Sequence, residues 1–199
     1  VGIALSAERN HDRLIERILV EAKELCGADG GTLYLTSEDG FALDFAILLN
    51  DTMGTHLGGT SGAPAGLPSL PVRDPDGRPN HRNVATYAAT SRRSVNVADA
   101  YAVDEFDFSG TKAFDARNGY RSRSFLTIPM IDSGNEVIGV LQLINAVDRD
   151  SGDVVPFGPE QQAIVEALAS QAAIALDNDQ LLRGQRRLME AFIQLIAEA

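Results

Sequence analysis

The chain has 199 residues, of which 44% are hydrophobic and 23% are charged. This length is enough for one sizeable core but not for two ordinary domains and a linker. The formal net charge of -11 opposes attraction to nucleic acid and to anionic membranes, so no nucleic-acid partner is expected. No apolar run approaches the roughly 20 residues that span a bilayer, and we expect no membrane segment within this chain. The single cysteine, Cys26, excludes an intramolecular disulfide framework and favours a cytoplasmic setting.

The first predicted element is an amphipathic helix. Apolar residues recur at three- and four-residue steps from Leu14 to Cys26, with charged residues between them. Gly27 is a suitable residue for the end of this helix. Residues 32–36 and 41–49 follow as two strands joined by a short turn, a pattern that predicts a hairpin.

Residues 51–82 show no apolar period. Eleven glycines and prolines fall between Gly54 and Pro79, which predicts a long connection rather than a regular element. A loop of this length is usually functional or mobile. Its glycine cluster, residues 58–62, lacks the lysine and the strand-to-helix context of a phosphate-binding loop. We therefore expect a surface excursion able to cover a pocket.

Two helices and a strand are predicted in the next part of the chain. The first helix is short and capped by Asn83, and a strand follows at residues 94–97. The second helix is expected to begin at Gly110 or Thr111 and to end at Gly119.

Two apolar strands follow at residues 124–131 and 136–147, separated by turn residues. Strands joined by so short a turn must be antiparallel neighbours. The order of the predicted elements therefore indicates an α+β domain with an antiparallel sheet.

A long helix is predicted from Pro159 to the end of the chain. Proline suits the first helical position, where its missing N–H matters least. The apolar stripe that we single out comprises Val165, Leu168, Ala172, Ala175 and Leu182. Apolar residues persist to the end of the chain, so this helix needs a further surface: an identical helix, a preceding helix of the same chain, or a downstream domain.

Three segments of the sequence resemble the GAF domain family. Residues 112–130 are similar to the ligand-facing helix and following strand, residues 136–145 to the penultimate sheet strand, and residues 169–178 to the closing helix. The resemblance covers roughly residues 8–183. It implies an α+β fold with a central antiparallel sheet of about six strands. The terminal helices are expected on one face, and a ligand pocket with helices and loops on the other.

Within this family, residues 51–62 and 119–130 are similar to sensor domains joined to HD-type metal-dependent phosphohydrolases, including the HD-GYP class. Residues 188–199 resemble the first helix that leads into such a catalytic domain. The resemblance implies a GAF sensor domain at residues 1–183, including the N-terminal helix, and a linker helix at residues 184–199 leading toward a missing effector domain. The implied role is regulation: a homodimer, formed through the terminal helices, signals to a phosphohydrolase in the same parent chain. The alternative is a ligand-free structural dimerisation module.

The chain itself lacks a recognisable catalytic set. A metal phosphohydrolase needs several histidines and carboxylates that converge on a binuclear centre. The doublet of His11 and Asp12 is accompanied only by His56 and His81. Neither a serine nor Cys26 stands in a nucleophile motif. We expect no catalytic residue, no metal ligand and no required cofactor.

The pocket is the expected functional site. Similarity to the phosphodiesterase-like branch of the family implies a cyclic nucleotide or another small molecule as ligand, with a phosphate near a helix N-terminus. The ligand-binding residues that the resemblance implies are Thr32, Tyr34, Asp99, Ala100, Phe108, Thr111, Phe114, Asp115 and Tyr120. Structural alternatives stay open for several of them: the aromatic residues as core, the aspartate at 115 as an arginine partner, and the threonine at 111 as a helix cap.

One departure from nucleotide-binding relatives concerns an ion pair that supports the pocket. Such relatives often carry an asparagine-lysine pair, then a phenylalanine and, four residues later, an aspartate-glutamate pair. Here Asn145 is followed by Ala146, and Phe157 leads to Gln161 and Gln162. The missing lysine and acids make a cyclic nucleotide less expected, while another ligand remains open.

Overall fold

The computed structural model describes residue 5 and residues 7–197. Residues outside this range are 1–4, 6, 198 and 199. The start of the expected sensor domain and the end of the expected linker helix therefore lie outside the described residues. The strands are β1 (Ala28–Thr36), β2 (Ala42–Asn50), β3 (Thr55–Gly58), β4 (Leu70–Pro71), β5 (Val95–Val97), β6 (Phe125–Ile131), β7 (Val137–Val147) and β8 (Val154–Val155). The helices are α2 (His11–Cys26), the 3₁₀ turn η1 (Gly59–Ser61), α3 (Val84–Ser91), α4 (Ser109–Asn118) and α5 (Pro159–Ala197).

One antiparallel sheet organises the chain. Its strand order is β3-β2-β1-β7-β6-β5, while β4 pairs with β2 and β8 pairs with β7. Both predicted hairpins are present, β1 with β2 and β6 with β7. The predicted α+β fold and central sheet of about six strands are confirmed, with two very short strands added at its margins.

The prediction that residues 51–82 hold no regular element was wrong. This segment contains β3, which pairs with β2 from Thr55 to Gly58, and the two-residue β4, which pairs with the start of β2. These strands are short and show no apolar alternation, because β3 lies at the edge of the sheet and none of its four residues is buried. Pairing with β2 defines them, and that pairing is not visible in the local sequence.

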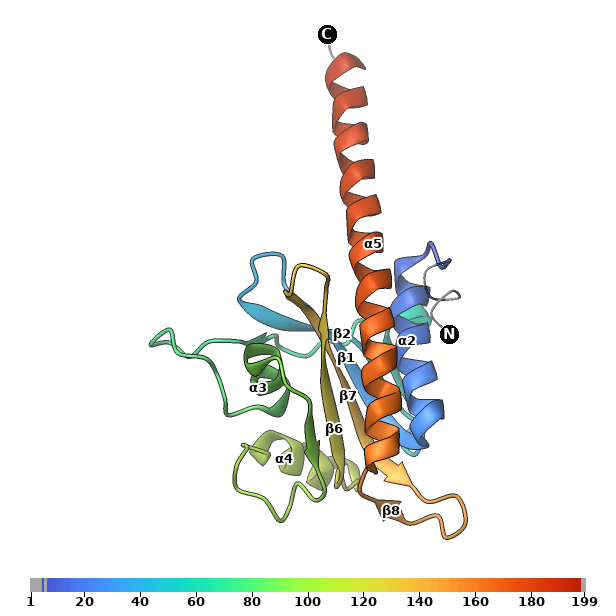
Figure 1. Cartoon of the computed structure of the whole chain (residues 1–199), viewed down its shortest axis with the longest axis vertical. Helices are drawn as coiled ribbons and strands as arrows, with labels where there is room; N and C mark the ends of the chain where they lie inside the picture. Colours follow the sequence, from blue (N-terminus) through green and yellow to red (C-terminus); the bar gives the residue numbers. More distant parts are fainter. Residues whose placement is uncertain (1–4, 6, 198–199) are drawn as a thin grey trace.

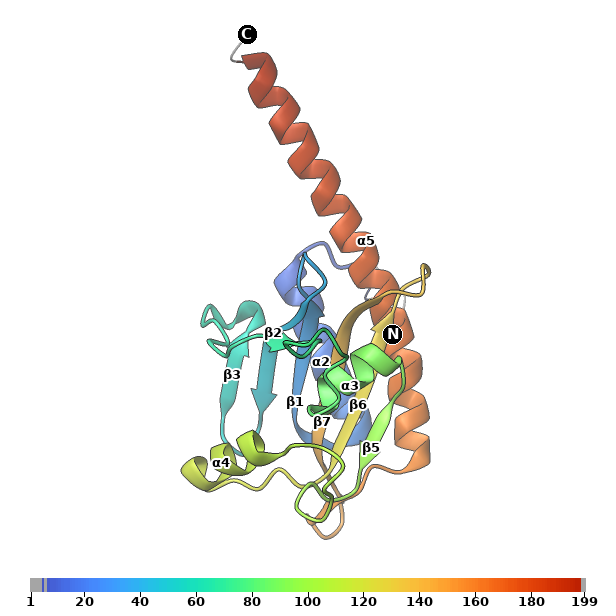
Figure 2. The same cartoon turned by 90° about the vertical axis from the view of Figure 1, so that its left-hand side faces the viewer.

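The helices divide between the two faces of the sheet (Figure 1). The terminal helices α2 and α5 lie together on one face, while α3, α4 and the long loop lie on the other, as the turned view in Figure 2 shows. This arrangement confirms the expected placement of the terminal helices. The largest buried cluster lies between α2, α5 and the sheet, and it includes Leu19, Leu33, Leu141, Leu143 and Leu168.

Helix α2 ends where its sequence predicts, and a side-chain cap that was not predicted marks its start. The Asn10 side chain accepts a hydrogen bond from the Arg13 amide (2.9 Å), and Gly27 ends the helix in the left-handed conformation at φ 61°. Close packing on the sheet depends on Gly31, because a Cβ there would lie 2.7 Å from Leu19 Cδ1. The apolar stripe of α2 therefore packs directly on strand β1.

Helix α5 runs without interruption through Gly184, so the expected boundary at residue 184 is not marked by a break in the helix. Val165, Leu168, Ala172 and Ala175 are buried, whereas Leu182 is 57% exposed. The stripe singled out from the sequence is therefore mostly core, and a preceding helix of the same chain, α2, is one of its partners. Beyond Asp179, none of the described residues of α5 is buried, and the helix projects away from the body (Figure 1).

Helix α4 starts earlier than predicted. It begins at Ser109, where the Asp107 carboxylate accepts a hydrogen bond from the Ser109 amide (2.9 Å). Thr111 thus lies inside the first turn, and its alternative role as the helix cap is not what the structure shows. Helix α3 follows its prediction closely, because the Asn83 side chain accepts from the Ala85 amide at 2.8 Å.

Candidate ligand-binding site

A cavity of about 350 Å³ lies on the face of the sheet opposite α2 and α5. Strands β1, β2 and β7 form its floor, α4 covers it, and residues 67–70 of the long loop lie at its side. Its size is within the range of small-molecule sites in proteins. The lining residues are Gly31, Thr32, Tyr34, Phe45, Leu48, Leu49, Asn50, Met53, Leu67, Pro68, Leu70, Asn83, Val84, Asp107, Phe108, Gly110, Thr111, Phe114, Arg117, Tyr120, Ser122, Phe125, Gln142 and Ile144.

Strand alternation decides which side chains reach the cavity. Successive side chains of a strand point to opposite faces of the sheet. On β1, Leu33 joins the core beneath the terminal helices, while Tyr34 lines the cavity. On β7, Leu141 likewise faces the helices and Gln142 faces the cavity.

A chain of hydrogen bonds crosses the floor of the cavity. The Tyr34 hydroxyl donates to Gln142 Oε1 (3.3 Å), and Gln142 Nε2 donates to Thr127 Oγ1 (3.1 Å). All three side chains are buried. Burial raises the pKa of the Tyr34 phenol, so this group stays protonated and remains a donor.

Aromatic rings form two walls. The ring of Tyr34 lies 4.7 Å from that of Phe45, centroid to centroid, and the ring of Phe108 lies 5.1 Å from that of Phe125. Phe106 extends the second wall behind Phe108. These contacts are within the range of favourable aromatic pairs, and they give the cavity apolar, aromatic sides.

One end of the cavity is closed by Tyr120. Its hydroxyl donates a hydrogen bond to the Asp29 carboxylate and accepts one from Asn145 Nδ2 (2.9 Å). Burial, followed by the bond to Asp29, raises the pKa of the Tyr120 phenol. Asn50 Nδ2 donates to the same carboxylate at 3.2 Å, so the end wall is a connected polar unit.

Helix α4 is fastened over the cavity through Asp115, its one buried residue. The Asp115 carboxylate accepts hydrogen bonds from the Ser122 amide (2.7 Å), the Ser122 hydroxyl (2.8 Å) and the Tyr101 hydroxyl (2.7 Å). The expected alternative, an ion pair with an arginine, is not the observed arrangement. Phe114, by contrast, is 37% exposed and lines the cavity.

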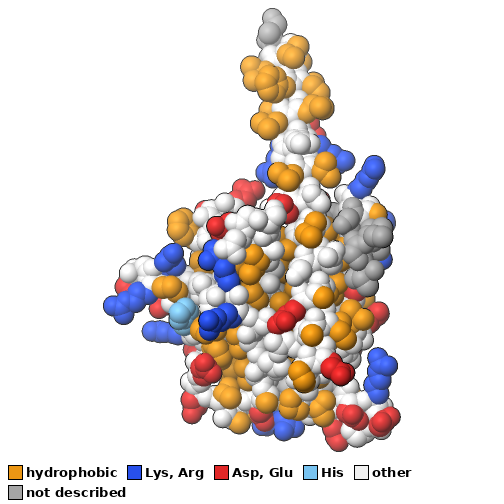
Figure 3. Space-filling model, in the orientation of Figure 1, with side chains coloured by type: hydrophobic (Ala, Val, Ile, Leu, Met, Phe, Trp, Pro, Cys, Tyr) orange, Lys and Arg blue, Asp and Glu red, His pale blue; other side chains and the backbone are white. Residues whose placement is uncertain are grey.

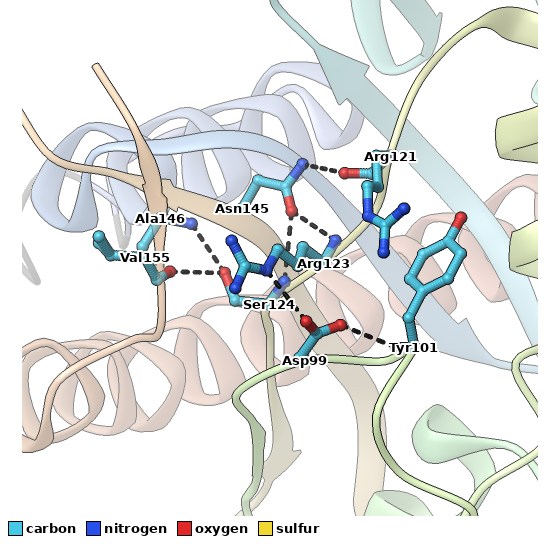
Figure 4. A network of polar contacts seen from close by, with 8 residues as sticks. All are labelled: Asp99, Tyr101, Arg121, Arg123, Ser124, Asn145, Ala146 and Val155. Atoms are coloured by element: carbon cyan, nitrogen blue, oxygen red, sulfur yellow. Dashed lines mark hydrogen bonds and ion pairs between the residues drawn. The ribbon is translucent and has the colours of Figure 1, made fainter. Parts of the chain in front are cut away.

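The segment that follows α4 is held in place by Asn145 (Figure 4). This residue has a positive φ of 57°, and its side chain accepts from the Arg123 amide (2.7 Å) and donates to the Arg121 carbonyl (2.8 Å). Asp99 belongs to the same network, because Arg123 Nε donates to its carboxylate at 3.0 Å. The Arg121 guanidinium lies over the Tyr101 ring, 4.0 Å from its centroid.

The structure thus separates the nine predicted ligand-binding residues into two groups. Thr32, Tyr34, Phe108, Thr111, Phe114 and Tyr120 line the cavity. The other three lie outside its lining: Asp99 in the network with Arg123, Ala100 fully buried, and Asp115 in the bonds that fasten α4.

Sequence reasoning missed several lining residues, of which Gln142, Asn50 and Phe45 are examples. Gln142 left a usable signal, because it is a polar residue in the middle of the apolar strand β7. Asn50 and Phe45 left none, because only the pairing of β2 with β1 brings them to the cavity.

Neutral side chains occupy the region where nucleotide-binding relatives carry an ion pair. Gln161 Nε2 donates to the Cys26 carbonyl (2.7 Å), and Gln161 Oε1 accepts from the Gly158 amide (2.7 Å). Asn96 Nδ2 donates to the Phe157 carbonyl (3.1 Å) and to Gln162 Oε1 (3.2 Å). These amides tie the start of α5 to α2 and to the sheet edge without a charged pair.

Within residue 5 and residues 7–197, no group of three or more His, Cys, Asp or Glu side chains is arranged to hold a metal ion. None of the helices in the same part of the chain combines the length and apolarity needed to cross a membrane. The arrangement that stands out chemically is therefore the cavity, which offers aromatic surface and a polar floor.

Comparisons with known proteins point to one domain family. The sequence profile of the GAF domain family matches residues 10–176. The dual 3′,5′-cyclic-AMP and -GMP phosphodiesterase 11A of Takifugu rubripes is 28% identical over 174 residues, which are 86% of this chain and 17% of that protein. The chain thus spans less than a fifth of the length of this relative.

Solved structures share the fold. The GAF domain of a phosphoenolpyruvate-protein phosphotransferase from Coxiella burnetii superposes with a TM-score of 0.65 at 16% identity, covering 91% of this chain and 90% of that chain. A GAF domain/HD domain protein from Geobacter sulfurreducens gives a TM-score of 0.59 at 20% identity, covering 89% and 98% respectively. With the family profile matching most of its length, this chain belongs to the GAF domain family.

Proposed function

We propose that this chain is the sensor of a larger signalling protein: it binds a small molecule in the cavity, forms a homodimer through its terminal helices, and regulates a downstream metal-dependent phosphohydrolase. GAF domains are regulatory small-molecule-sensing domains, and this one has phosphodiesterase relatives. The observation that carries the proposal is the cavity itself, enclosed between the sheet and α4 on the face opposite the helix that leaves the domain.

The sheet connects the cavity to α5, the helix that projects from the domain. Gln142 contacts the cavity while its neighbours Leu141 and Leu143 pack beneath α2 and α5. A ligand that prefers one arrangement of β1 and β7 therefore also favours one position of α5. The difference in ligand-binding free energy between the two arrangements of the strands sets how far binding shifts the position of α5.

The projecting part of α5 supports a dimer. Ile174, Leu181, Leu188 and Leu195 recur at intervals of seven and are all exposed. With these residues as the d positions of a heptad, the a positions are Gln171, Asn178, Gln185 and Phe192. An apolar residue at every d position gives a seam with the period of a coiled coil, and polar residues at a fix its register at a cost in stability. A second copy of this chain is therefore the partner that we assign to this stripe, the α5 seam.

Figure 3 shows apolar side chains along the projecting part of α5. A parallel dimer places two identical C-terminal ends side by side, which suits the delivery of a signal to paired effector domains. The likeness to a GAF domain/HD domain protein supports an HD-type phosphohydrolase as that effector. A cytoplasmic location is part of the proposal and rests on the single, buried, unpaired Cys26.

Analytical ultracentrifugation tests the dimer. The 199-residue chain is expected to sediment as a dimer, and Leu188→Asp is expected to sediment as a monomer, because the aspartate would be buried in the seam. Ile193→Asp is the matched control: Ile193 is also exposed on α5 but lies off the seam, so this variant should remain dimeric. A monomeric parent chain would remove the dimer from the proposal.

Calorimetry tests sensing. Cyclic mononucleotides and cyclic dinucleotides are the candidates that the relatives suggest, and heat of binding with slower amide exchange along α5 would support a relay. The competing function is a ligand-free dimerisation module, which the internally bonded polar groups of the cavity favour. A dimer that responds to no small molecule of any class would establish that alternative.

A further inference from the structure

The polar side chains deepest in the cavity are already bonded to one another. Tyr34 and Gln142 form part of the floor chain, and the Ser122 hydroxyl donates to Asp115. Among residues 7–197 and residue 5, the buried side-chain atoms without a hydrogen-bond partner are Glu21 Oε2 and Ser91 Oγ. Neither residue lines the cavity. Every fully buried polar side-chain atom of the described lining therefore already has a hydrogen-bond partner.

The charges around the cavity do not favour an anion. Of the described lining residues, Asp107 and Arg117 are the two with charged side chains. The Asp107 carboxylate already occupies the N-terminus of α4, where hydrogen bonds from the Ser109 side chain and the Ser109 amide hold its pKa below the usual range. A phosphate approaching that helix end would meet a negative charge at the position that the helix dipole would otherwise offer.

The arginine does not compensate for this carboxylate. Arg117 is exposed near the C-terminal end of α4, and its Nε donates to the Ala113 carbonyl of the same helix at 3.2 Å. A charged ligand group inside the cavity would thus lose its hydration without gaining a buried cation. The remaining lining is dominated by aliphatic and aromatic side chains, among them Leu48, Phe108, Phe114 and Ile144.

We infer that the cavity selects an uncharged, largely apolar aromatic molecule and discriminates against phosphate-bearing ligands such as cyclic nucleotides. The inference rests on the proposed sensing function and names the chemical class of its ligand. Aromatic side chains in both walls offer ring faces and edges to an aromatic ligand, and the internally bonded floor leaves little polar surface for a charged group to meet.

Indole and indole-3-acetate form a matched pair of probes that differ by a carboxylate side chain. The chain contains no tryptophan, so indole excited beyond the absorption band of tyrosine reports binding without background from the protein. We expect saturable binding of indole to the 199-residue chain, and binding of indole-3-acetate that is weaker by about tenfold or more. Cyclic AMP, added as a competitor, is expected to leave the bound indole in place.

Ile144→Phe fills the cavity from the middle of β7 and should abolish indole binding. Leu25→Phe is the matched control, because Leu25 is 45% exposed on α2 and lies outside the lining, so this variant should bind like the parent. Leu48→Phe on β2, which also lines the cavity, provides a second blocking variant if Ile144→Phe does not fold.

The outcomes separate this inference from the proposed function. Tighter binding of indole-3-acetate or displacement of indole by cyclic AMP would overturn the ligand class and leave small-molecule sensing standing. Indole binding that survives both blocking variants would overturn the assignment to this cavity. Binding of neither indole, indole-3-acetate nor cyclic AMP would overturn the inference and count against sensing as well.

Discussion

The two faces of the sheet are built from alternate residues of the same strands but are filled differently. On the helix face, Leu33, Leu141 and Leu143 are fully buried in one continuous cluster with α2 and α5. On the other face, the neighbouring residues Tyr34 and Gln142 border a cavity. One face therefore supplies most of the stability, while the other keeps the space that a binding site requires.

The sharpest test of this contrast compares two residues of β7 that each lose three side-chain carbons on truncation. Leu141→Ala is expected to lower the free energy of unfolding by about 2–5 kcal/mol, because it opens a hole in a packed cluster. Ile144→Ala should lower it by about 1 kcal/mol or less, because Ile144 already borders a cavity. Urea unfolding measures both, and equal losses would contradict the comparison.

The next largest effect concerns the fastening of α4. Asp115→Asn replaces one accepting oxygen by an N–H₂ group that faces other donors, and should cost about 1–3 kcal/mol. Amide exchange of α4 should quicken while that of α2 is unchanged. Asp150→Asn in the exposed turn after β7 is the control and should alter neither rate. Unaltered exchange in Asp115→Asn would show that α4 is held by other contacts.

Two helix caps test whether equal losses of stability on the two faces of the sheet have unequal effects on ligand binding. Asn10→Ala on α2 and Asn83→Ala on α3 each remove a side-chain bond to a helix amide and should each cost about 1 kcal/mol. Because Asn83 lines the cavity, its replacement should also change the affinity for indole, whereas Asn10→Ala should not. Equal affinities in both variants would contradict this difference.

A fourth prediction concerns alkaline pH. Burial raises the pKa of Tyr34 and of Tyr120, so both phenols stay neutral in the folded chain when unfolded tyrosines, near pH 10, begin to ionise. Their contribution to stability is complete below that pH and falls as the pH rises toward the folded-state values, by about 1 kcal/mol per tyrosine between pH 10 and 11. Urea unfolding of Tyr120→Phe should show a shallower decline, and a decline as steep as that of the parent would be the contrary result.

The predictable part of the site follows from local rules. Thr32 and Tyr34 were expected to reach the pocket from a strand, and Phe114 and Tyr120 from α4 and its following turn, and all four line the cavity. Asp99, Ala100 and Asp115 lie near the same elements but outside the lining. Their position depends on how residues 99–123 fold back on β7. Hydrogen bonds from Asn145 to Arg121 and Arg123 fix this arrangement, and the sequence does not reveal contacts between residues so far apart in the chain.

Helix α5 illustrates the same limit. Its length was predictable from an apolar period that starts at Pro159. Which stripe is core was not, because two apolar stripes share the helix: one through Leu168 and one through Leu181. Only the position of the sheet and of α2 shows that Leu168 is buried and Leu181 exposed.

The sequence alone determined the elements whose signals are local: the capped helices, the two hairpins and the alternation of apolar residues that gives an α+β domain. The tertiary structure decided the edge strand β3, the core side of α5 and the outline of the cavity. The physical reason is range. Caps, turns and periodicity act between residues a few positions apart, whereas strand neighbours and empty space depend on contacts between segments that are distant in the chain.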